Sequence, residues 1–297
     1  MGNFSICIPY QPDGGYRDKI YRWTRARWEA LYPNADIVTG HDDTGGEWLN
    51  RCRMRNNAAR QAKTDTLIFV DADAFPMDSN FVPSLIRELD AGAGIAQIKQ
   101  IHWLGGKDAA EYIMNQSPRG NISIPAGTVV WSDCYGLTFA MTRQTLDTVG
   151  GWDERFCGWG EEDPAMLLAI NTLVGQTVRI DGYVGHIWHP RGIEHDERTA
   201  RFRDNKALRE LYDIAHGRPR MMLDVIEKPY EWMALRPPAP KHTLYMFNRD
   251  IGFMRDDAPG DAIYHQGQIR VLPAWIMRQA WFFKCIEAGH VSEVRDG

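Results

Sequence analysis

Residues 66–73 constrain the fold more than any other part of the chain, because an apolar run ends there in two carboxylates. The run TLIFV is rich in β-branched and aromatic side chains, which predicts a strand covered on both faces, as in a parallel sheet. Asp71 and Asp73 follow it, separated by one residue, so their side chains lie on the same side of an extended backbone. At the end of such a strand, paired carboxylates favour a bound metal or substrate, although an isolated Asp-x-Asp triplet more often caps a helix.

The first seventy residues alternate between strand and helix patterns. Residues 4–9, 35–39 and 66–70 are typical of strands, and residues 16–31 and 51–63 have apolar side chains at helical spacing. This alternation predicts an α/β fold, a Rossmann-like, mainly parallel sheet flanked by helices. Ligands of such folds lie beyond the carboxyl ends of the strands.

The remaining pattern predicts one large domain followed by a small module. In the large domain we expect a loop at 105–125, strands at 95–98, 135–141, 178–180 and 183–186, and helices at 79–89, 143–149, 164–173 and 197–215. The Pro-rich residues 236–240 favour a linker. The predicted division is a catalytic domain at 1–217, a linker at 218–240 and a small α+β module at 241–297, with two strands and an aromatic helix at 273–288.

Composition narrows the class of function and the location. The net charge of -5 disfavours sequence-independent binding to nucleic acid, so small-molecule or protein substrates are favoured. The chain opens without a basic leader, and no apolar run approaches the ~20 residues of a membrane span. The five cysteines lack CxxC spacing and suit a reducing compartment. These features predict a cytoplasmic protein with no membrane span.

A second acidic cluster, Glu161, Glu162 and Asp163, stands just before Pro164 at the start of a predicted helix. Acids at a helix N-terminus are stabilised by the helix dipole, so capping alone would account for them. However, the Trp159-Gly160 step before them adds an aromatic wall and a bare backbone. That combination suits recognition and deprotonation of a sugar hydroxyl, and it predicts a general base at this helix start.

His186 and His189 form the third group of candidate residues, near the end of a predicted strand. A lone histidine is more often a satisfied polar residue than a ligand. Two histidines downstream of two acidic clusters favour a metal site, and imidazole with carboxylate suits Mn²⁺ better than Mg²⁺. The spacing also fits zinc, but no further Cys or His ligand is close in sequence.

Together these motifs resemble the nucleotide-sugar glycosyltransferases of the A-type (GT-A) fold, in a family-2-like arrangement. Residues 5–10 resemble the opening strand of that group, and residues 55–59 followed by 69–73 resemble its Arg-Asn helix and DxD strand. Residues 150–163 are similar to the acidic segment of the β-1,4-galactosyltransferases. Residues 184–186 resemble the Val-Gly-His of the polypeptide N-acetylgalactosaminyltransferases. The motifs occur in the expected order over residues 4–215.

The resemblance implies metal-dependent transfer of a hexose or N-acetylhexosamine from a nucleotide sugar, with a UDP-linked donor favoured, to a hydroxyl of a glycan, protein or modified-nucleotide acceptor. Asp163 would be the general base, and Glu162 would hold a sugar hydroxyl. Mn²⁺ or Mg²⁺ would be bound by Asp73 and His186, with His189 as the rival ligand and Asp71 on ribose or metal. Donor contacts are expected from Pro9, Tyr10, Asp42, Asp43, Arg55, Asn56, Asp71 and Ala72, and acceptor or sugar contacts from Gly136, Trp159, Gly160 and Glu161.

Three alternatives stay open at this point. We expect transfer with inversion, but the Val-Gly-His likeness is to retaining enzymes, so a retaining glycosyltransferase is the first alternative. A nucleotidyltransferase would normally carry a basic Gly-rich loop after the first strand, and residues 11–15 hold no Lys or Arg. A non-catalytic glycan-binding protein is disfavoured because Asp71, Asp73, Asp163 and His186 are all present.

The last sixty residues show no catalytic motif and vaguely resemble accessory modules of bacteriophage-encoded proteins. This likeness implies the cytoplasm of a bacterium or of a phage-infected host cell. Trp281, Phe282 and Phe283 would suit a homodimer contact through the module, and packing of these aromatics against the main domain is the competing interpretation.

Overall fold

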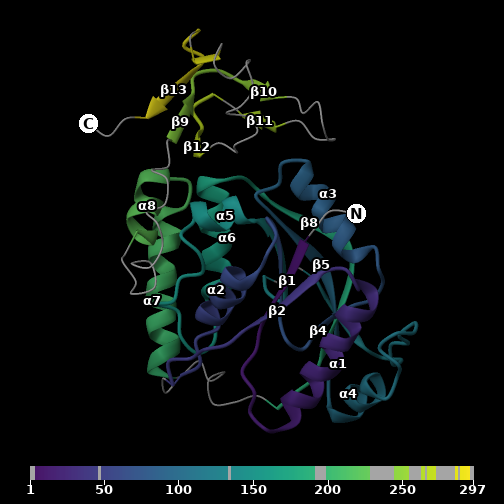
Figure 1. Ribbon diagram of the computed structural model, residues 1–297. Helices are drawn as coiled ribbons and strands as arrows, with labels where there is room; N and C mark the ends of the chain where they lie inside the picture. The colour runs from purple at the N-terminus through teal and green to yellow at the C-terminus, as the bar shows by residue number, and fades with distance from the viewer. Residues whose placement is uncertain are drawn as a thin grey trace.

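The computed structural model describes residues 4–45, 48–132, 135–190, 199–227, 244–253, 262–264, 266–271, 285–286 and 288–294 (Figure 1). Its helices are α1 (Tyr16–Leu31), α2 (Arg51–Gln61), α3 (Phe81–Asp90), α4 (Lys107–Met114), α5 (Arg143–Thr148), α6 (Glu162–Leu173), α7 (Ala200–Ala215) and α8 (Pro219–Ile226). Its strands are β1 (Phe4–Pro9), β2 (Asp36–Gly40), β3 (Thr66–Val70), β4 (Ala74–Pro76), β5 (Ile95–Leu104), β6 (Val129–Ser132), β7 (Thr138–Thr142), β8 (Thr177–Ile187), β9 (Leu244–Phe247), β10 (Ile251–Phe253), β11 (Ala262–Tyr264), β12 (Ile269–Val271) and β13 (Val291–Val294).

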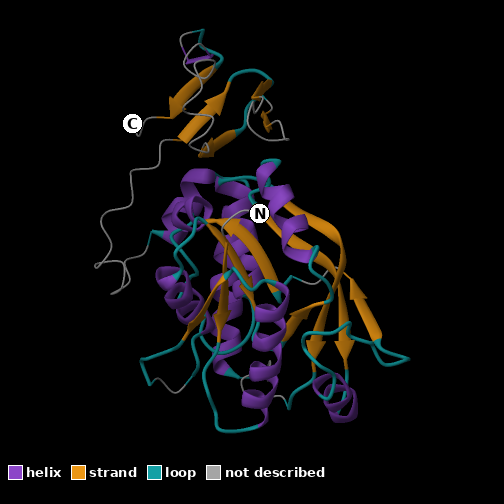
Figure 2. Cartoon of the chain, turned by 45° about the vertical axis from the view of Figure 1, so that its right-hand side comes forward, coloured by secondary structure: helices purple, strands orange, loops and turns teal. Residues whose placement is uncertain are grey.

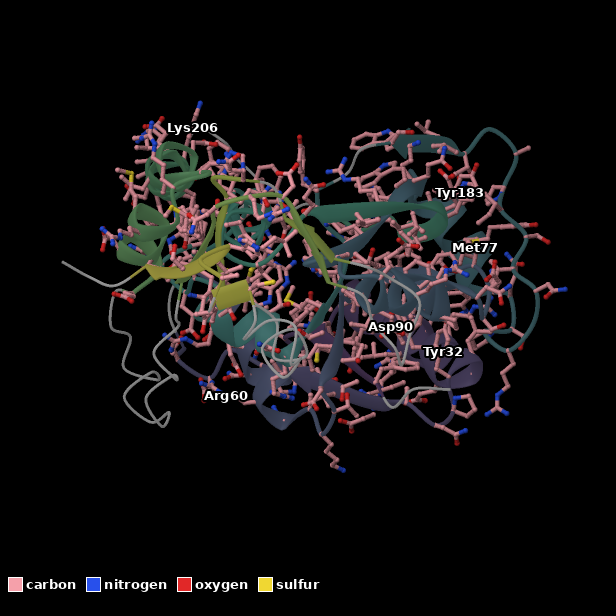
Figure 3. The ribbon with its side chains drawn as sticks, turned by 90° about the horizontal axis from the view of Figure 1, so that it is seen from above. Tyr32, Arg60, Met77, Asp90, Tyr183 and Lys206 are labelled. Carbon is pink, nitrogen blue, oxygen red and sulfur yellow. The ribbon has the colours of Figure 1, made fainter. Side chains whose placement is uncertain are left out.

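An eight-stranded sheet organises the main body, in the order β2-β1-β3-β7-β5-β8-β4 with β6 attached to β5. β1 pairs in parallel with β2 and β3, and β5 pairs in parallel with β8. β7 is antiparallel to both β3 and β5, so these two point the same way. In the view from above, Tyr183 of β8 and Lys206 of α7 lie on opposite sides of this body (Figure 3). The predicted α/β class with a mainly parallel sheet is confirmed.

Alternate residues of the central strands pack into two separate hydrophobic cores, one on each face of the sheet. Ile6 and Ile8 of β1 pack with Trp28 of α1 and Leu85 of α3. Cys7, between them, belongs to a second cluster that includes buried residues of α2, α5, α6, α7 and α8. Because strand side chains alternate between faces, one apolar strand serves both cores, and helices cover both faces of the sheet (Figure 2).

The strands that share one direction bring their carboxyl ends to one edge of the sheet. Tyr10 follows β1, Asp71 follows β3, Gly105 follows β5, and His189 lies just beyond β8. β7 runs the opposite way, so it begins at this edge, immediately after Gly136 and Leu137. Residues far apart in the sequence therefore meet where ligands of parallel sheets bind.

The structure differs from the sequence interpretation in the middle of the chain. Residues 105–125, expected as a loop, contain α4, whose Ala110 and Ile113 are fully buried. The strands expected at 178–180 and 183–186 form one strand, β8. Gly182 has a φ of +137° there, and the register of β8 against β5 shifts between Ile98 and Gln100. A glycine takes this conformation without a Cβ clash, so it bends the strand instead of ending it. The edge strand β6 was not predicted.

The C-terminal part forms its own small sheets, with β12-β9-β13 in one and β10-β11 in the other, grouped apart from the main sheet (Figure 2). Residues 219–226, assigned to a linker from the sequence, form α8, and Met222 and Ile226 pack in the main core. Trp281, Phe282, Phe283 and nearly all of the expected helix at 273–288 lie outside the described residues. The division at 217 and 240 stays a prediction.

The described helices are short. The longest, α1 and α7, have 16 residues each. None of those in the described part of the chain is long and apolar enough to cross a membrane. The four described cysteines, Cys7, Cys52, Cys157 and Cys285, are free thiols.

Candidate active site

A cleft of about 1240 Å³ lies at the carboxyl edge of the sheet. Its wall includes residues from the ends of β1, β3 and β8, from the start of β7, and from the N-terminus of α6. Most of the residues predicted to bind donor, acceptor or metal line this one cleft. They are Pro9, Tyr10, Asp71, Ala72, Asp73, Gly136, Trp159, Gly160, Glu161, Glu162, Asp163, His186 and His189.

Asp73, His186 and His189 form a compact group on one wall of the cleft. One ligand atom from each lies within 4.8 Å of the other two. Asp73 Oδ1 is 3.5 Å from His186 Nε2, and Asp73 Oδ2 is 3.0 Å from His189 Nε2. Backbone pairing sets this geometry, because Ala74 of β4 pairs with His186 of β8 and the Ile187 amide donates to the Asp73 carbonyl. Both candidate histidines therefore lie beside Asp73, where both could contact one metal ion.

The charge states of Asp73 and His186 suit a metal ligand set. Burial lowers the pKa of His186, so its imidazole is neutral at neutral pH. Burial acts to raise the pKa of Asp73, but His186 and His189 outweigh it and hold that pKa below its ordinary value. Burial acts to lower the pKa of His189, but the hydrogen bond to Asp73, the charge of Asp73 and the Pro190 carbonyl together outweigh burial and raise that pKa. Neutral imidazole and ionised carboxylate are the forms that bind metal ions.

Two buried atoms of the group have no hydrogen-bond partner among the described residues, Asp73 Oδ1 and His186 Nδ1. Asp73 is 7% exposed and His186 is 6% exposed. A buried carboxylate oxygen without a donor costs free energy unless something else compensates its charge. These orphaned atoms and the His-His-Asp donor set fit a divalent metal ion.

Three carboxylates and two guanidinium groups form a second constellation, around the N-terminus of α6. Arg55 of α2 donates from Nη1 to Asp163 Oδ1 at 2.7 Å and from Nη2 to Asp71 Oδ1 at 3.0 Å. Arg51 Nη2 lies 3.2 Å from Glu162 Oε1. With all groups ionised, this cluster carries one more negative than positive charge, which favours one shared proton.

The excess of negative charge in this cluster acts on the pKa of Asp163. Burial raises it most, and the neighbouring carboxylates of Glu162 and Asp71 raise it further. Arg55 acts in the opposite direction, and the resulting pKa is about 7. A carboxylate with a pKa near neutrality is suited to accept a proton from a hydroxyl.

The backbone before α6 is tightly turned. Gly160 has a φ of +96° and Glu161 a φ of +75°, both in the left-handed region. Asn205 of α7 holds the turn by donating to the carbonyls of Trp159 and Gly160. Trp159 stacks on Phe202 of α7 with ring centroids 5.7 Å apart. This turn aims the first residues of α6, Glu162 and Asp163, at the cleft.

Four predicted donor residues do not line the cleft. Asn56 is buried and uses its amide to hold Trp152 and Glu154. Arg55 is 1% exposed and lies beneath the cleft, behind Asp71 and Asp163. Asp42 accepts hydrogen bonds from the backbone of Asn50 and Thr44 and so shapes the entry to α2, and Asp43 is exposed next to it.

Several cleft residues were missed by the sequence interpretation. Trp103, the penultimate residue of β5, stacks on Trp131 of β6, with centroids 5.0 Å apart and an interplanar angle of 9°. Arg17, in the first turn of α1, also lines the cleft and acts on the pKa values of Asp73 and His189. The sequence did offer a signal for Arg17, because it is the first basic residue after β1 and stands two residues past the loop 11–15. The sequence offered no comparable signal for Trp131, because its strand β6 has only four residues and all four are exposed.

Comparisons with known proteins bear on the same region. Residues 125–191 match the profile of the family described as the N-terminal domain of galactosyltransferase. A search of curated proteins finds no match.

Solved structures with similar folds include the catalytic domain of Drosophila β1,4-galactosyltransferase 7 in complex with xylobiose, with 12% identity, a TM-score of 0.39, and coverage of 90% of this chain and 94% of that one. S. aureus TarS 1–349 has 13% identity, a TM-score of 0.46, and coverage of 76% and 69%. GalNAc-T7 with UDP, GalNAc and Mn²⁺ has 12% identity, a TM-score of 0.44, and coverage of 90% and 66%.

The matched segment holds the second and third motifs singled out from the sequence. It contains Gly136, the turn at Trp159, Asp163 and both histidines, and it runs from before β6 to just beyond β8. The expected resemblance to glycosyltransferases of the A-type fold is confirmed, and so is the expectation of an enzyme of that class.

Proposed function

We propose that the protein transfers a hexose or N-acetylhexosamine from a UDP-linked sugar to an acceptor hydroxyl with inversion, using Asp163 as the general base. The observation that carries this proposal is that a metal-ligand group and a near-neutral carboxylate line the same cleft. The two groups of residues would act on different parts of the reaction. The Asp73 side suits the leaving diphosphate, and the Asp163 side suits the attacking hydroxyl.

Asp163 would remove the proton of the acceptor hydroxyl as that oxygen attacks the anomeric carbon. The proton moves from the hydroxyl to an Asp163 carboxylate oxygen, the new glycosidic bond forms, and the bond to the diphosphate breaks with its electron pair on the leaving group. The Asp163 side chain is 19% exposed, so it reaches the cleft while Arg55 holds it from behind. A base with a pKa of about 7 gives both an ionised form at neutral pH and a useful proton affinity.

Asp73, His186 and His189 would hold a divalent ion, which we propose to be Mn²⁺. When bound, the ion supplies positive charge that offsets the negative charge of the departing nucleoside diphosphate. Mixed imidazole and carboxylate ligands suit Mn²⁺ better than Mg²⁺ and also accept Zn²⁺. The role of Asp71 is then on the donor side, because it is paired with Arg55 and is not among the three grouped ligands.

Pro9 and Tyr10 would border the nucleoside. Tyr10 is held from behind, since its ring stacks on Tyr21 with centroids 3.9 Å apart and its hydroxyl donates to Asp18. Trp159 and Gly160 would face the acceptor or the transferred sugar. A UDP donor is proposed because the matched family is described by galactosyl transfer.

A screen of nucleotide sugars tests the function. Thermal unfolding is measured with UDP-, GDP- and dTDP-linked hexoses and N-acetylhexosamines, each with Mn²⁺, Mg²⁺, Zn²⁺ or chelator. We expect a rise in melting temperature for a UDP-linked donor with Mn²⁺. The stabilising donor is then incubated with sugar acceptors, and the anomeric configuration of the product is read by NMR. The absence of stabilisation and of turnover by every donor would contradict the proposal, and a retained configuration would contradict inversion alone.

We further propose action in the cytoplasm, which the free thiols support because a reducing compartment keeps them reduced. A homodimer contact through the C-terminal module stays a prediction. Sedimentation measurements of the molecular mass in solution, on the full chain and on a chain that lacks residues 241–297, test the contact.

A further inference from the structure

Arg55 is the one described residue whose side chain bonds to both Asp71 and Asp163. It comes from the second turn of α2 and is 1% exposed, whereas the side chains of Asp71 and Asp163 are 20% and 19% exposed. Both carboxylates line the cleft, and Arg55 does not. The guanidinium group therefore supports the floor of the site and does not contact a ligand in the cleft.

The guanidinium plane is fixed from a third direction. Its central carbon lies 4.3 Å from the ring centroid of Trp152 and 5.6 Å from that of Phe139. Both aromatic rings are buried in the core beneath the cleft. Stacking on these rings restricts rotation of the guanidinium group, so its two nitrogens present a rigid fork.

One rigid fork then sets the distance between two carboxylates that come from different elements, Asp71 after β3 and Asp163 on α6. Each carboxylate is held through one oxygen, Oδ1 in both cases. The other oxygen of Asp163 faces Gly136, since a Cβ added there would stand 2.6 Å from Oδ2. The charged groups around Asp163 are Arg51 and Arg55 from α2, Asp71, and Glu162 from its own helix, with the Cys52 thiol nearby.

We propose that Arg55 is a positioning residue that fixes the general base Asp163 relative to the donor-side carboxylate Asp71. This inference rests on the proposed function, because it gives Asp163 the role of base. The sequence interpretation placed Arg55 on the donor, and its burial behind both carboxylates argues for a different role. Arg55 acts on the reaction through Asp163 and touches neither substrate.

The opposite charge of Arg55 also has an electrostatic consequence. An opposite charge in contact lowers a carboxyl pKa by ~1–3 units, so its removal raises the pKa by a similar amount. Arg55→Met removes both the charge and the fork. Arg55→Lys keeps the charge but replaces a planar fork by a single ammonium, which cannot hold two carboxylates in the same geometry.

The matched control is Arg53→Met. Arg53 lies on the same helix and makes its own ion pair, from Nε to Glu154 Oε2 at 2.9 Å, but it does not line the cleft and does not contact Asp163. A variant that merely weakens α2 should resemble Arg53→Met in its melting temperature and keep the wild-type pH behaviour.

Two readouts separate this inference from the proposed function. The first is the ¹³C chemical shift of the Asp163 carboxyl carbon against pH, assigned by its loss in Asp163→Asn and measured without substrate. The second is the pH profile of kcat for transfer at saturating donor.

For Arg55→Met we expect the ¹³C midpoint and the acidic limb of the kcat profile to move up by ~1–3 pH units. For Arg55→Lys we expect a midpoint within ~1 unit of wild type but a kcat at least ~10-fold lower, since a small misplacement of the base slows transfer. For Arg53→Met we expect neither change. If Arg55→Met fails to fold, the kcat of Arg55→Lys alone tests whether Arg55 positions Asp163.

A wild-type midpoint in folded Arg55→Met, or a wild-type kcat in Arg55→Lys, would overturn the inference. A shifted ¹³C midpoint with an unshifted kcat profile would uphold the contact to Asp163 but remove Asp163 as the base, which is a failure of the proposed function.

Discussion

The indole of Trp103 lies parallel to the imidazole of His186, with ring centroids 4.2 Å apart and an interplanar angle of 8°. Trp131 stacks on the other face of Trp103, so three rings form a column from the exposed strand β6 to the candidate metal group. Register explains the contact, because Trp103 of β5 and His186 of β8 are paired neighbours in the sheet. The column fixes the ring plane of a proposed metal ligand.

Trp103→Ala should therefore weaken Mn²⁺ binding. Residues that orient a ligand typically contribute 10- to 100-fold to metal affinity, and we expect a loss near ~10-fold here. Trp103→Phe should retain most of the affinity because it keeps a flat ring. Free Mn²⁺ measured by electron paramagnetic resonance gives the dissociation constant directly. Tyr112→Ala, an aromatic residue 48% exposed that does not line the cleft, is the control. Equal affinities in all three variants would contradict the role of the column.

Asp163→Asn should abolish most turnover and leave donor binding nearly unchanged. A general base contributes ~10²- to 10⁴-fold, and kcat should fall by that factor. Burial and the neighbouring carboxylates raise the pKa of Asp163 to about 7, so the active, ionised form is gained as pH rises through 7. Wild-type kcat at saturating donor should thus increase about tenfold for each pH unit below 7 and level off above it. A flat profile from pH 5 to 8, or full activity of Asp163→Asn, would exclude this base.

The same raised pKa has a consequence for stability. The folded state holds a proton on Asp163 at pH values where the unfolded chain, with an ordinary carboxyl pKa near 4, has released it. Stability contributed by this group is therefore present at low pH and is lost as pH rises from about 4 through 7. Asp163→Asn cannot ionise at this position, so the variant should not lose this stability as pH rises. It also leaves two positive charges, Arg51 and Arg55, against two negative charges, Asp71 and Glu162. We expect the variant to melt several degrees above wild type at pH 8 and to show no gain at pH 4, by calorimetry at both pH values.

The sequence predicted the elements whose side chains repeat regularly. The bounds of α1 agree at both ends, because Ile20, Trp23 and Trp28 mark one buried face and Pro33 follows soon after. Strand β3 was recognised from its apolar run, and its two acids were assigned to a ligand site. These are local patterns, and the sequence shows them directly.

What the sequence could not show is which distant residues meet. Arg55 was placed on the donor from its motif, yet its neighbours Asp71 and Asp163 are 16 and 108 residues away. These contacts join α2 to the end of β3 and to the start of α6, and no local sequence period encodes which elements meet. Asn56 was placed on the donor for the same reason, and in the structure its buried amide donates to the Trp152 carbonyl and to Glu154 Oε1. Trp103 and His186 likewise meet only through sheet register.

Glu161 stands in the left-handed region with a φ of +75°, a conformation that favours glycine. A residue with a Cβ pays roughly 1 kcal/mol or more for that conformation. Its carboxylate lies 3.7 Å from Arg209, a partly exposed pair that contributes little. Glu161→Gly should therefore raise the melting temperature by a few degrees, while Glu161→Ala should not. A lower melting temperature for Glu161→Gly than for Glu161→Ala would show that the side chain, and not the backbone, decides stability here.

Gly136→Ala should disable the proposed base without altering any charged group. The added Cβ would stand 2.6 Å from Asp163 Oδ2, closer than such atoms approach in proteins, so the carboxylate must move. A displacement on the order of 1 Å at a reacting group can cost ~100-fold in rate, and we expect kcat to fall at least ~10-fold with a nearly unchanged KM for donor. Gly120→Ala is the control, since its Cβ would meet the Ser117 carbonyl oxygen at an ordinary 3.7 Å. Steady-state kinetics and melting curves on both variants separate a local displacement from a loss of fold. A wild-type kcat in Gly136→Ala would mean that Asp163 need not occupy this position for transfer.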